Sequence, residues 1–180
     1  MNAGWDQLAK RPAAIDSFLR GNIFGVWTAC DACSELFRYI SNRYQTDQAL
    51  IVSGFDSQQI LLYAYQNLSW QLDSVLRHVA APVTNLPEYS TEILPLVDAL
   101  SKPALPTDSA ASNTRQYYLQ QIQDQLNARL PEDNFWLLVV ENLLQTNIQY
   151  SLRKTDYWAS TNARDIQMAR NLKWLSTVKY

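Results

Sequence analysis

The sequence predicts an all-α protein: an antiparallel helical bundle of about five to six helices with a proline-rich crossover in the middle. Three observations favour this fold class. Apolar residues recur at alternating spacings of three and four over long stretches, which is the periodicity of one helix face. The chain has four glycines, too few for the tight turns of a many-stranded β architecture. Five of its seven prolines fall between Pro82 and Pro106, so the helix breakers concentrate in the middle of the chain.

A chain of 180 residues has the size of one ordinary domain. We expect residues 1–180 to form a single helical domain. Its helical halves, 12–81 and 113–177, are joined by the proline-rich segment 82–112. The two helices expected in the first half could not bury both of their sides alone, which favours one domain with a crossover over two domains.

The first half is expected to contain two long helices. Pro12 is tolerated in a first helical turn, and a sustained apolar seam then predicts one long helix up to Tyr44, with a bend near Gly21 and Gly25 left open. Asp56 or Ser57 caps a second helix, which Pro82 ends. Two such helices joined by a short connector should pack antiparallel. The seam of the first helix comprises Leu19, Ile23, Val26, Cys30, Cys33, Phe37, Ile40 and Tyr44.

The proline-rich segment and the second half carry further helical patterns. Residues 90–101 predict a short helix, and a longer one begins at Asn113 or Thr114 and is broken by Pro131. The next helix starts at Asp133 or Asn134. It is apolar all round at 135–140, so we expect it to be central in the bundle. A last amphipathic segment, 162–175, carries the apolar positions Ile166, Ala169, Leu172 and Leu175.

The polar composition limits the function classes. The sequence contains 15 Gln and 12 Asn but only 15 Lys and Arg together, and its net charge is −2. The exposed faces should therefore be neutral and rich in hydrogen-bonding groups. Binding to a phosphate backbone requires clustered cations, so this composition argues against it as the main activity.

Neither a metal site nor a catalytic motif is apparent. Cys30 and Cys33 form a lone C-x-x-C, but the chain has no other cysteine and only one histidine, His78. A zinc site needs two further thiolates or imidazoles, so both cysteines are interpreted as small apolar core residues. The common nucleotide-binding and zinc-hydrolase motifs are absent from the sequence. We expect no cofactor and no catalytic residue.

The sequence also predicts no membrane-spanning segment. Its longest unbroken apolar stretches have six residues, far fewer than a bilayer requires, and the first residues do not resemble a signal peptide. A cytoplasmic location is expected.

Charge is unevenly distributed along the chain. Residues 45–100 contain one basic and six acidic residues, a balance of −5, whereas residues 151–180 contain six basic and two acidic ones, a balance of +4. The basic end also carries Tyr157, Trp158 and Trp174. Cations interleaved with rings can stack on bases or meet an acidic surface. The basic end could therefore dock on the acidic middle, within one chain or between two copies.

Three functional hypotheses follow. The first is a non-enzymatic protein–protein interaction module, such as an adaptor, an immunity-type inhibitor or a regulatory subunit, with another protein or a second copy as partner. Its expected surface comprises Trp70, Trp158, Trp174, Arg170 and Lys173, and Trp5 is a further candidate for an exposed ring.

The second hypothesis is a small-ligand-binding bundle or an enzyme with an interhelical pocket near Tyr65, Glu141 and Asn142. The third is nucleic-acid binding through residues 151–180.

Overall fold

The computed structural model describes residues 2–8, 11–23, 25–29, 31–44, 46–102 and 109–179. Within these ranges the chain forms helices, turns and extended connectors, with no β-strand, so the all-α prediction is confirmed. The chain divides into two compact units. The N-terminal unit comprises Met1–Gly54 and Leu61–Gln66, and the C-terminal unit comprises Phe55–Ile60 and Asn67–Tyr180. That the whole chain is one domain stays a prediction.

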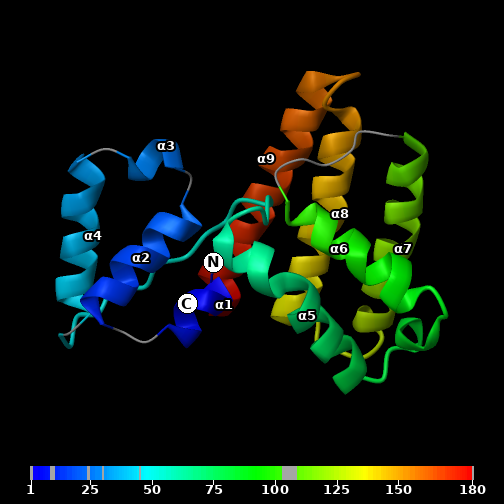
Figure 1. The fold of residues 1–180 in the computed structure, drawn as a ribbon, viewed down its shortest axis with the longest axis horizontal. Coiled ribbons are helices and arrows are strands. Elements are labelled where there is room, and N and C mark those ends of the chain that lie inside the picture. Colours follow the sequence, from blue (N-terminus) through cyan, green and yellow to red (C-terminus); the bar gives the residue numbers. More distant parts are fainter. Residues whose placement is uncertain are drawn as a thin grey trace. The chain divides into compact units, whose positions relative to one another are not determined.

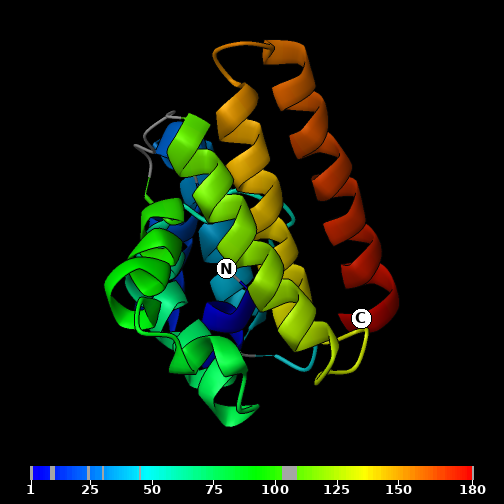
Figure 2. The same ribbon diagram turned by 90° about the vertical axis from the view of Figure 1, so that its right-hand side faces the viewer.

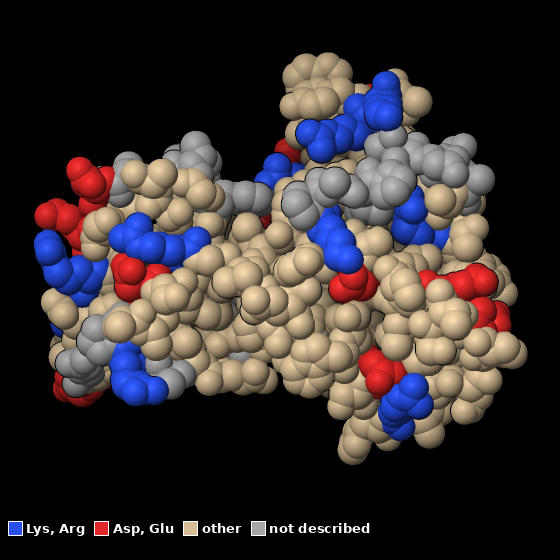
Figure 3. Space-filling model, in the orientation of Figure 1, with Lys and Arg blue, Asp and Glu red and all other residues tan. Residues whose placement is uncertain are grey.

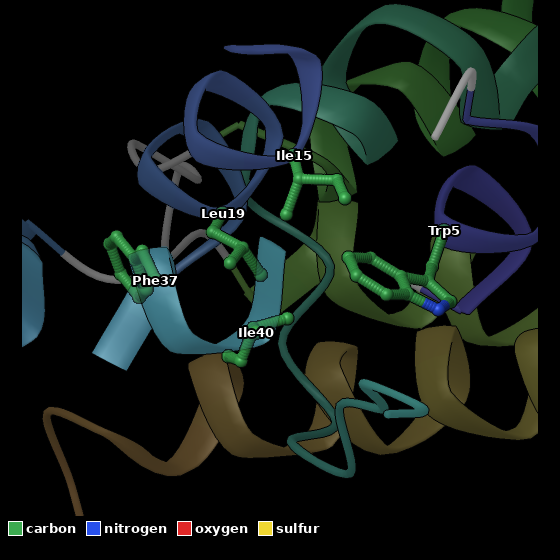
Figure 4. Packing of buried hydrophobic residues seen from close by; sticks show 5 residues of the cluster. All are labelled: Trp5, Ile15, Leu19, Phe37 and Ile40. Atoms are coloured by element: carbon green, nitrogen blue, oxygen red, sulfur yellow. The ribbon is translucent and has the colours of Figure 1, made fainter. Parts of the chain in front are cut away.

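The N-terminal unit is built around five buried apolar residues from three short helices (Figure 4). Trp5 contributes an indole edge-on to the ring of Tyr44, with the ring centroids 5.7 Å apart. Those three helices are α1 (Asn2–Gln7), α2 (Pro12–Asn22) and α4 (Asp31–Arg43), and the one-turn helix α3 (Gly25–Thr28) lies between α2 and α4 in the chain. The five core residues are Trp5, Ile15, Leu19, Phe37 and Ile40.

The prediction of one long helix up to Tyr44 is wrong. Helix α2 ends at Asn22 because Ile23 adopts an extended conformation, with φ −123° and ψ 142°. The buried side chain of Asn22 supplies hydrogen bonds where the helix stops. Its Nδ2 donates to the carbonyl of Phe18 at 2.9 Å, and its Oδ1 accepts from the backbone N–H of Tyr63 at 2.9 Å. The apolar seam is therefore divided among α2, α3 and α4. Cys30, one of its predicted members, lies outside the described residues.

The C-terminal unit holds the longer helices. Helix α5 (Leu62–His78) enters it at Asn67, and a 3₁₀ turn (Pro82–Asn85) and a π-helical turn (Tyr89–Ile93) lead to α6 (Leu94–Leu100). Ile93, Val97 and Leu100 are fully buried, as expected for the predicted short helix over 90–101. The remaining helices are α7 (Ser109–Asn127), α8 (Phe135–Leu152) and α9 (Tyr157–Trp174), which ends in a π-helical turn (Leu175–Lys179).

Helices α7, α8 and α9 lie side by side and alternate in direction, with α8 in the middle (Figures 1 and 2). Helix α8 begins where predicted, because the side chain of Asn134 accepts a hydrogen bond from the backbone N–H of Trp136 at 2.9 Å. It packs against α6, α7 and α9, and Val140 and Leu143 are fully buried. The predicted central position of this helix is confirmed.

Candidate functional site

Helix α9 buries polar side chains. Its cap is Asp156, whose carboxylate accepts from the backbone N–H of Ala159 at 2.9 Å. The residues that this helix buries are Ser160, Gln167 and Asn171, with Gln167 wholly inaccessible to solvent. A helix on the outside of a bundle normally buries aliphatic residues, so this inward face requires polar partners on the elements it covers.

Those partners are on α8 and on the connector before α5. Asn171 donates from Nδ2 to Oδ1 of Asn142 at 2.7 Å and to the carbonyl of Phe55 at 3.0 Å. Gln167 donates from Nε2 to Oδ1 of Asn171 at 3.1 Å, and Ser160 donates to the carbonyl of Gln149 at 2.9 Å. The α8–α9 interface is thus held in large part by buried hydrogen bonds, which fix a unique alignment of the two helices.

Residues 55–60, here called the strap, have no helical structure and bond to both α8 and α9. The carboxylate of Asp56 forms a two-pronged ion pair with the guanidinium of Arg164. This hydrogen bond to Asp56 is the main reason that the pKa of Arg164 is raised. On α8, Thr146 donates to the carbonyl of Ser57 at 3.2 Å, and Gln59 of the strap donates to the carbonyl of Val139 at 3.3 Å.

The outward face of α9 carries the apolar residues instead. Trp158 is 79% exposed, Ile166 48% and Leu172 54%, and Ala169 between them is also exposed. Of the four apolar positions noted in the segment 162–175, Ile166, Ala169 and Leu172 thus lie toward solvent, and Leu175 is buried. The physical reason is that Asn142 on α8 and the carbonyl of Phe55 on the strap bind the amide side of α9. The aliphatic side of the helix therefore faces solvent.

The predicted surface tryptophans differ in their environments. Trp158 stands in an edge-to-face pair with Tyr157, with centroids 5.8 Å apart. Trp70 on α5 is 57% exposed, and its Nε1 donates to Asn67 of the same helix at 3.3 Å. The indole of Trp174 is partly buried: it donates to the carbonyl of Asp133 at 3.1 Å. Trp5, the further candidate for an exposed ring, is 3% exposed and belongs to the N-terminal core.

The structure brings together one residue predicted for the surface and one predicted for a pocket. Arg170 on α9 donates from Nη1 to Oε1 of Glu141 on α8 at 2.7 Å. Asn142 beside it belongs to the buried hydrogen bonds described above. Tyr65 is 50% exposed and belongs to the N-terminal unit. Lys173 is exposed on α9, and its carbonyl accepts from Ser176 and Thr177 at the end of the helix.

Sequence reasoning missed the buried polar strip on α8. Asn142, Thr146, Asn147 and Gln149 follow the apolar start of α8 and are all buried. The available signal was their number: a central helix can bury four polar side chains only if its neighbours supply matching donors and acceptors. Asn171 of α9 supplies a donor to Asn142, while Thr146 and Gln149 bond to the strap and Asn147 bonds to α7.

Charged residues are sparse between broad uncharged areas on the face shown in Figure 3. Lys and Arg gather there over the turn that joins α8 to α9, where Arg153 and Lys154 are exposed. Within the described ranges, no three His, Cys, Asp or Glu residues converge in a way that could hold a metal ion.

No protein-family model, curated protein or solved structure shows significant similarity to this chain. None of the helices that the structure describes combines the length and apolarity needed to cross a bilayer.

Proposed function

We propose that this chain is a non-enzymatic protein–protein interaction module that docks through the outward side of α9. The observation that carries the proposal is the inverted polarity of this helix, which buries Gln167 and Asn171 and exposes aromatic and aliphatic residues. We call this surface the α9 face. It comprises Trp158, Asn162, Asp165, Ile166, Ala169, Leu172, Lys173 and Ser176, all of them exposed.

A partner that covers this face would bury apolar area that stays exposed in the folded chain, which favours binding. Single exposed apolar residues are ordinary on protein surfaces, but an external helix whose apolar side points outward while its amides are buried is not. Burial of apolar area contributes about 25 cal/mol per Å². Because Ile166 and Leu172 are about half exposed, they contribute little to the free energy of folding. Their apolar area would be buried by contact with another surface.

The charges favour a protein partner over a nucleic acid. Two cations of the basic C-terminal segment are engaged within the C-terminal unit, Arg164 by Asp56 and Arg170 by Glu141. A cation that already neutralises a carboxylate cannot neutralise a phosphate without losing that pair. Of the other cations in this segment, Arg153 and Lys154 lie at the turn between α8 and α9 and Lys173 lies on the last turns of α9, so they do not adjoin to form one phosphate-binding surface.

Binding of a small ligand near Glu141 and Asn142 has weaker support. The carboxylate of Glu141 is held by Arg170, and the Asn142 side chain donates to the carbonyl of Leu138 at 2.9 Å while it accepts from Asn171. A ligand at these residues would have to replace existing hydrogen bonds. The cytoplasmic location expected from the sequence stays a prediction alongside this proposal.

Site-specific photocrosslinking tests the docking role. A photoreactive residue at Leu172 is expected to crosslink a discrete partner in the native host, and one at the exposed control position Asn113 on α7 is not. Binding of that partner, once purified, is then measured directly. Leu172→Glu should weaken it at least about tenfold, since a charge would be buried in an apolar contact. Asn113→Glu should leave it unchanged. Equal binding by wild type and Leu172→Glu would exclude the α9 face as the docking surface.

A further inference from the structure

We infer that the α9 face binds the α9 face of a second copy, with the two helices antiparallel and a two-fold axis beside Ala169. This inference rests on the proposed docking function and specifies its partner. It follows from the order of residues along the face, which is complementary to itself when reversed.

The positions on the α9 face are arranged symmetrically about Ala169. Ile166 and Leu172 lie three residues before and after it, and Asp165 and Lys173 lie four before and after. In an antiparallel pair of helices with a two-fold axis at Ala169, each residue lies level with its counterpart in the other copy. Ile166 of one copy is then level with Leu172 of the other, so aliphatic residues meet on both sides of the crossing.

The charges select the antiparallel direction. Asp165 of each copy would lie level with Lys173 of the other, which gives two equivalent attractive pairs. A parallel pair would instead set Asp165 against Asp165 and Lys173 against Lys173, and like charges in register are repulsive. Both side chains are exposed, and neither forms an ion pair with another residue in the described part of the chain, so both are available for a second copy.

The centre of the face permits close approach. Ala169 is the smallest side chain on it, and a small residue at a crossing point lets two helix axes come within the usual range of about 8–10 Å. Trp158 at one end of the face is 79% exposed, and Val178, two residues beyond Ser176 at the other end, is 43% exposed. Antiparallel pairing brings the Trp158 end of one copy toward the Val178 end of the other, so exposed apolar groups meet there too.

The contact is small, which sets the expected affinity. A stable interface buries about 800 Å² per partner, and one helix face provides less than that. We therefore expect a reversible dimer with a dissociation constant on the order of 10 μM. Sedimentation equilibrium of the full chain, from about 1 μM to about 500 μM, covers the range from monomer to dimer for such a constant.

Charge reversal tests both the partner and the direction. Asp165→Lys alone and Lys173→Asp alone should each weaken the dimer about tenfold, because each change makes two attractive pairs repulsive. The double variant Asp165→Lys/Lys173→Asp should restore the wild-type constant to within about threefold. Ala169→Glu, which sets two carboxylates together on the axis, should abolish dimerisation. Asp124→Lys, an exposed reversal on α7, is the matched control and should have no effect.

The outcomes separate this inference from the docking proposal. A wild-type chain that stays monomeric throughout, while a photocrosslink at Leu172 still captures a partner whose binding Leu172→Glu weakens, overturns self-association and leaves docking intact. A dimer unaffected by Ala169→Glu overturns the inferred interface. A dimer lost with Ala169→Glu but unaffected by the single charge reversals overturns the antiparallel direction. Circular dichroism and thermal melting of every variant should match wild type, since all substituted positions are exposed.

Discussion

Arg115 donates from Nε to Oδ1 of Asn147 at 2.8 Å, and both side chains are buried where α7 packs on α8. Every hydrogen-bonding position of the Asn147 amide is used. Its Oδ1 also accepts from the Ser112 hydroxyl at 3.3 Å, and its Nδ2 donates to the carbonyl of Ser112 at 3.0 Å and to Gln116 at 3.2 Å. A fully bonded buried amide fixes the alignment of α7 on α8.

Asn147→Ala should lower the free energy of unfolding by about 2–3 kcal/mol, because it leaves buried donors and acceptors on α7 without this amide. Urea denaturation followed by circular dichroism measures the change. The control is Asn113→Ala, an exposed amide on α7, for which we expect a change within about 0.5 kcal/mol. A loss for Asn147→Ala no larger than that of the control would contradict a structural role for the amide.

Two buried serines of the C-terminal unit should respond oppositely to the same substitution. Ser57 is wholly buried and its hydroxyl oxygen has no hydrogen-bond partner among the described residues, whereas the Ser160 hydroxyl donates to the carbonyl of Gln149 at 2.9 Å. Ser57→Ala should leave stability unchanged or raise it by up to about 1 kcal/mol, since it removes a desolvated hydroxyl. Ser160→Ala should cost about 1 kcal/mol. The melting temperatures of the two variants measure these changes. A larger loss of stability for Ser57→Ala than for Ser160→Ala would contradict the assigned hydrogen bonding.

The sequence signals that succeeded were those set by local chemistry and by strong apolar periodicity. The continuous apolar run before Glu141 required burial on several sides, and α8 is indeed central. Asn134 was recognisable as a helix cap because its side chain can satisfy an early backbone N–H, which it does. The short helix over 90–101 was likewise marked by its apolar spacing, and Ile93, Val97 and Leu100 are its buried side.

The features that were not predicted depend on contacts between distant residues. Asn22 ends α2 because it binds the backbone of Tyr63, which lies 41 residues further along the chain. The same holds for the orientation of α9. The periodicity of α9 is compatible with either of its faces packing on the bundle. The polar face is the one buried, because Asn171 bonds to the Asn142 amide and to the strap carbonyl of Phe55. One sequence without its tertiary contacts cannot rank these two orientations.

The buried hydroxyl of Tyr89 should make the folded protein less stable at alkaline pH. It is 2% exposed, and its hydroxyl donates to Asp73 at 2.7 Å. Burial, and next the hydrogen bond to Asp73, raise the pKa of Tyr89 well above its ordinary value. Below pH of about 10 both the folded and unfolded states keep the phenolic proton, so the contribution is fully present. At higher pH the unfolded chain loses this proton while the folded chain retains it, and the free energy of unfolding falls.

The measurement is the slope of stability against pH. Between pH of about 10 and 11, wild type should lose up to about 1.4 kcal/mol per pH unit more than Tyr89→Phe, which has no proton to lose at this position. Tyr150, whose pKa is also raised by burial, is present in both proteins and cancels in the comparison. Parallel slopes for the two proteins would show that Tyr89 does not titrate differently in the folded state.

Ala80 occupies a backbone conformation that favours glycine. Its φ is 50°, and the next N–H, that of Ala81, donates to the carbonyl of Leu76 at 2.9 Å, which closes the end of α5. Ala80→Gly should raise the free energy of unfolding by about 0.5–1 kcal/mol, because glycine adopts positive φ without steric cost. Ala128→Gly, at an exposed position after α7, is the comparison and should bring no such gain. A melting temperature that rises no more for Ala80→Gly than for Ala128→Gly would refute the assignment.

The ion pair between Asp56 and Arg164 should control how firmly the strap is held. Asp56→Asn keeps the Oδ1 acceptor that binds the backbone N–H of Gln58 at 3.1 Å, and it removes the charge and the Oδ2 acceptor of Arg164. Because the paired side chains are 26% and 34% exposed, we expect a cost of about 1 kcal/mol. Amide hydrogens of the strap should then exchange about fivefold faster, as followed by mass spectrometry. Glu35→Gln, which breaks the far more exposed pair with Arg38, should leave exchange in α4 unchanged. Unaltered exchange in the strap of Asp56→Asn would mean that the hydrogen bonds from Thr146 and Asn171 hold it without the charge.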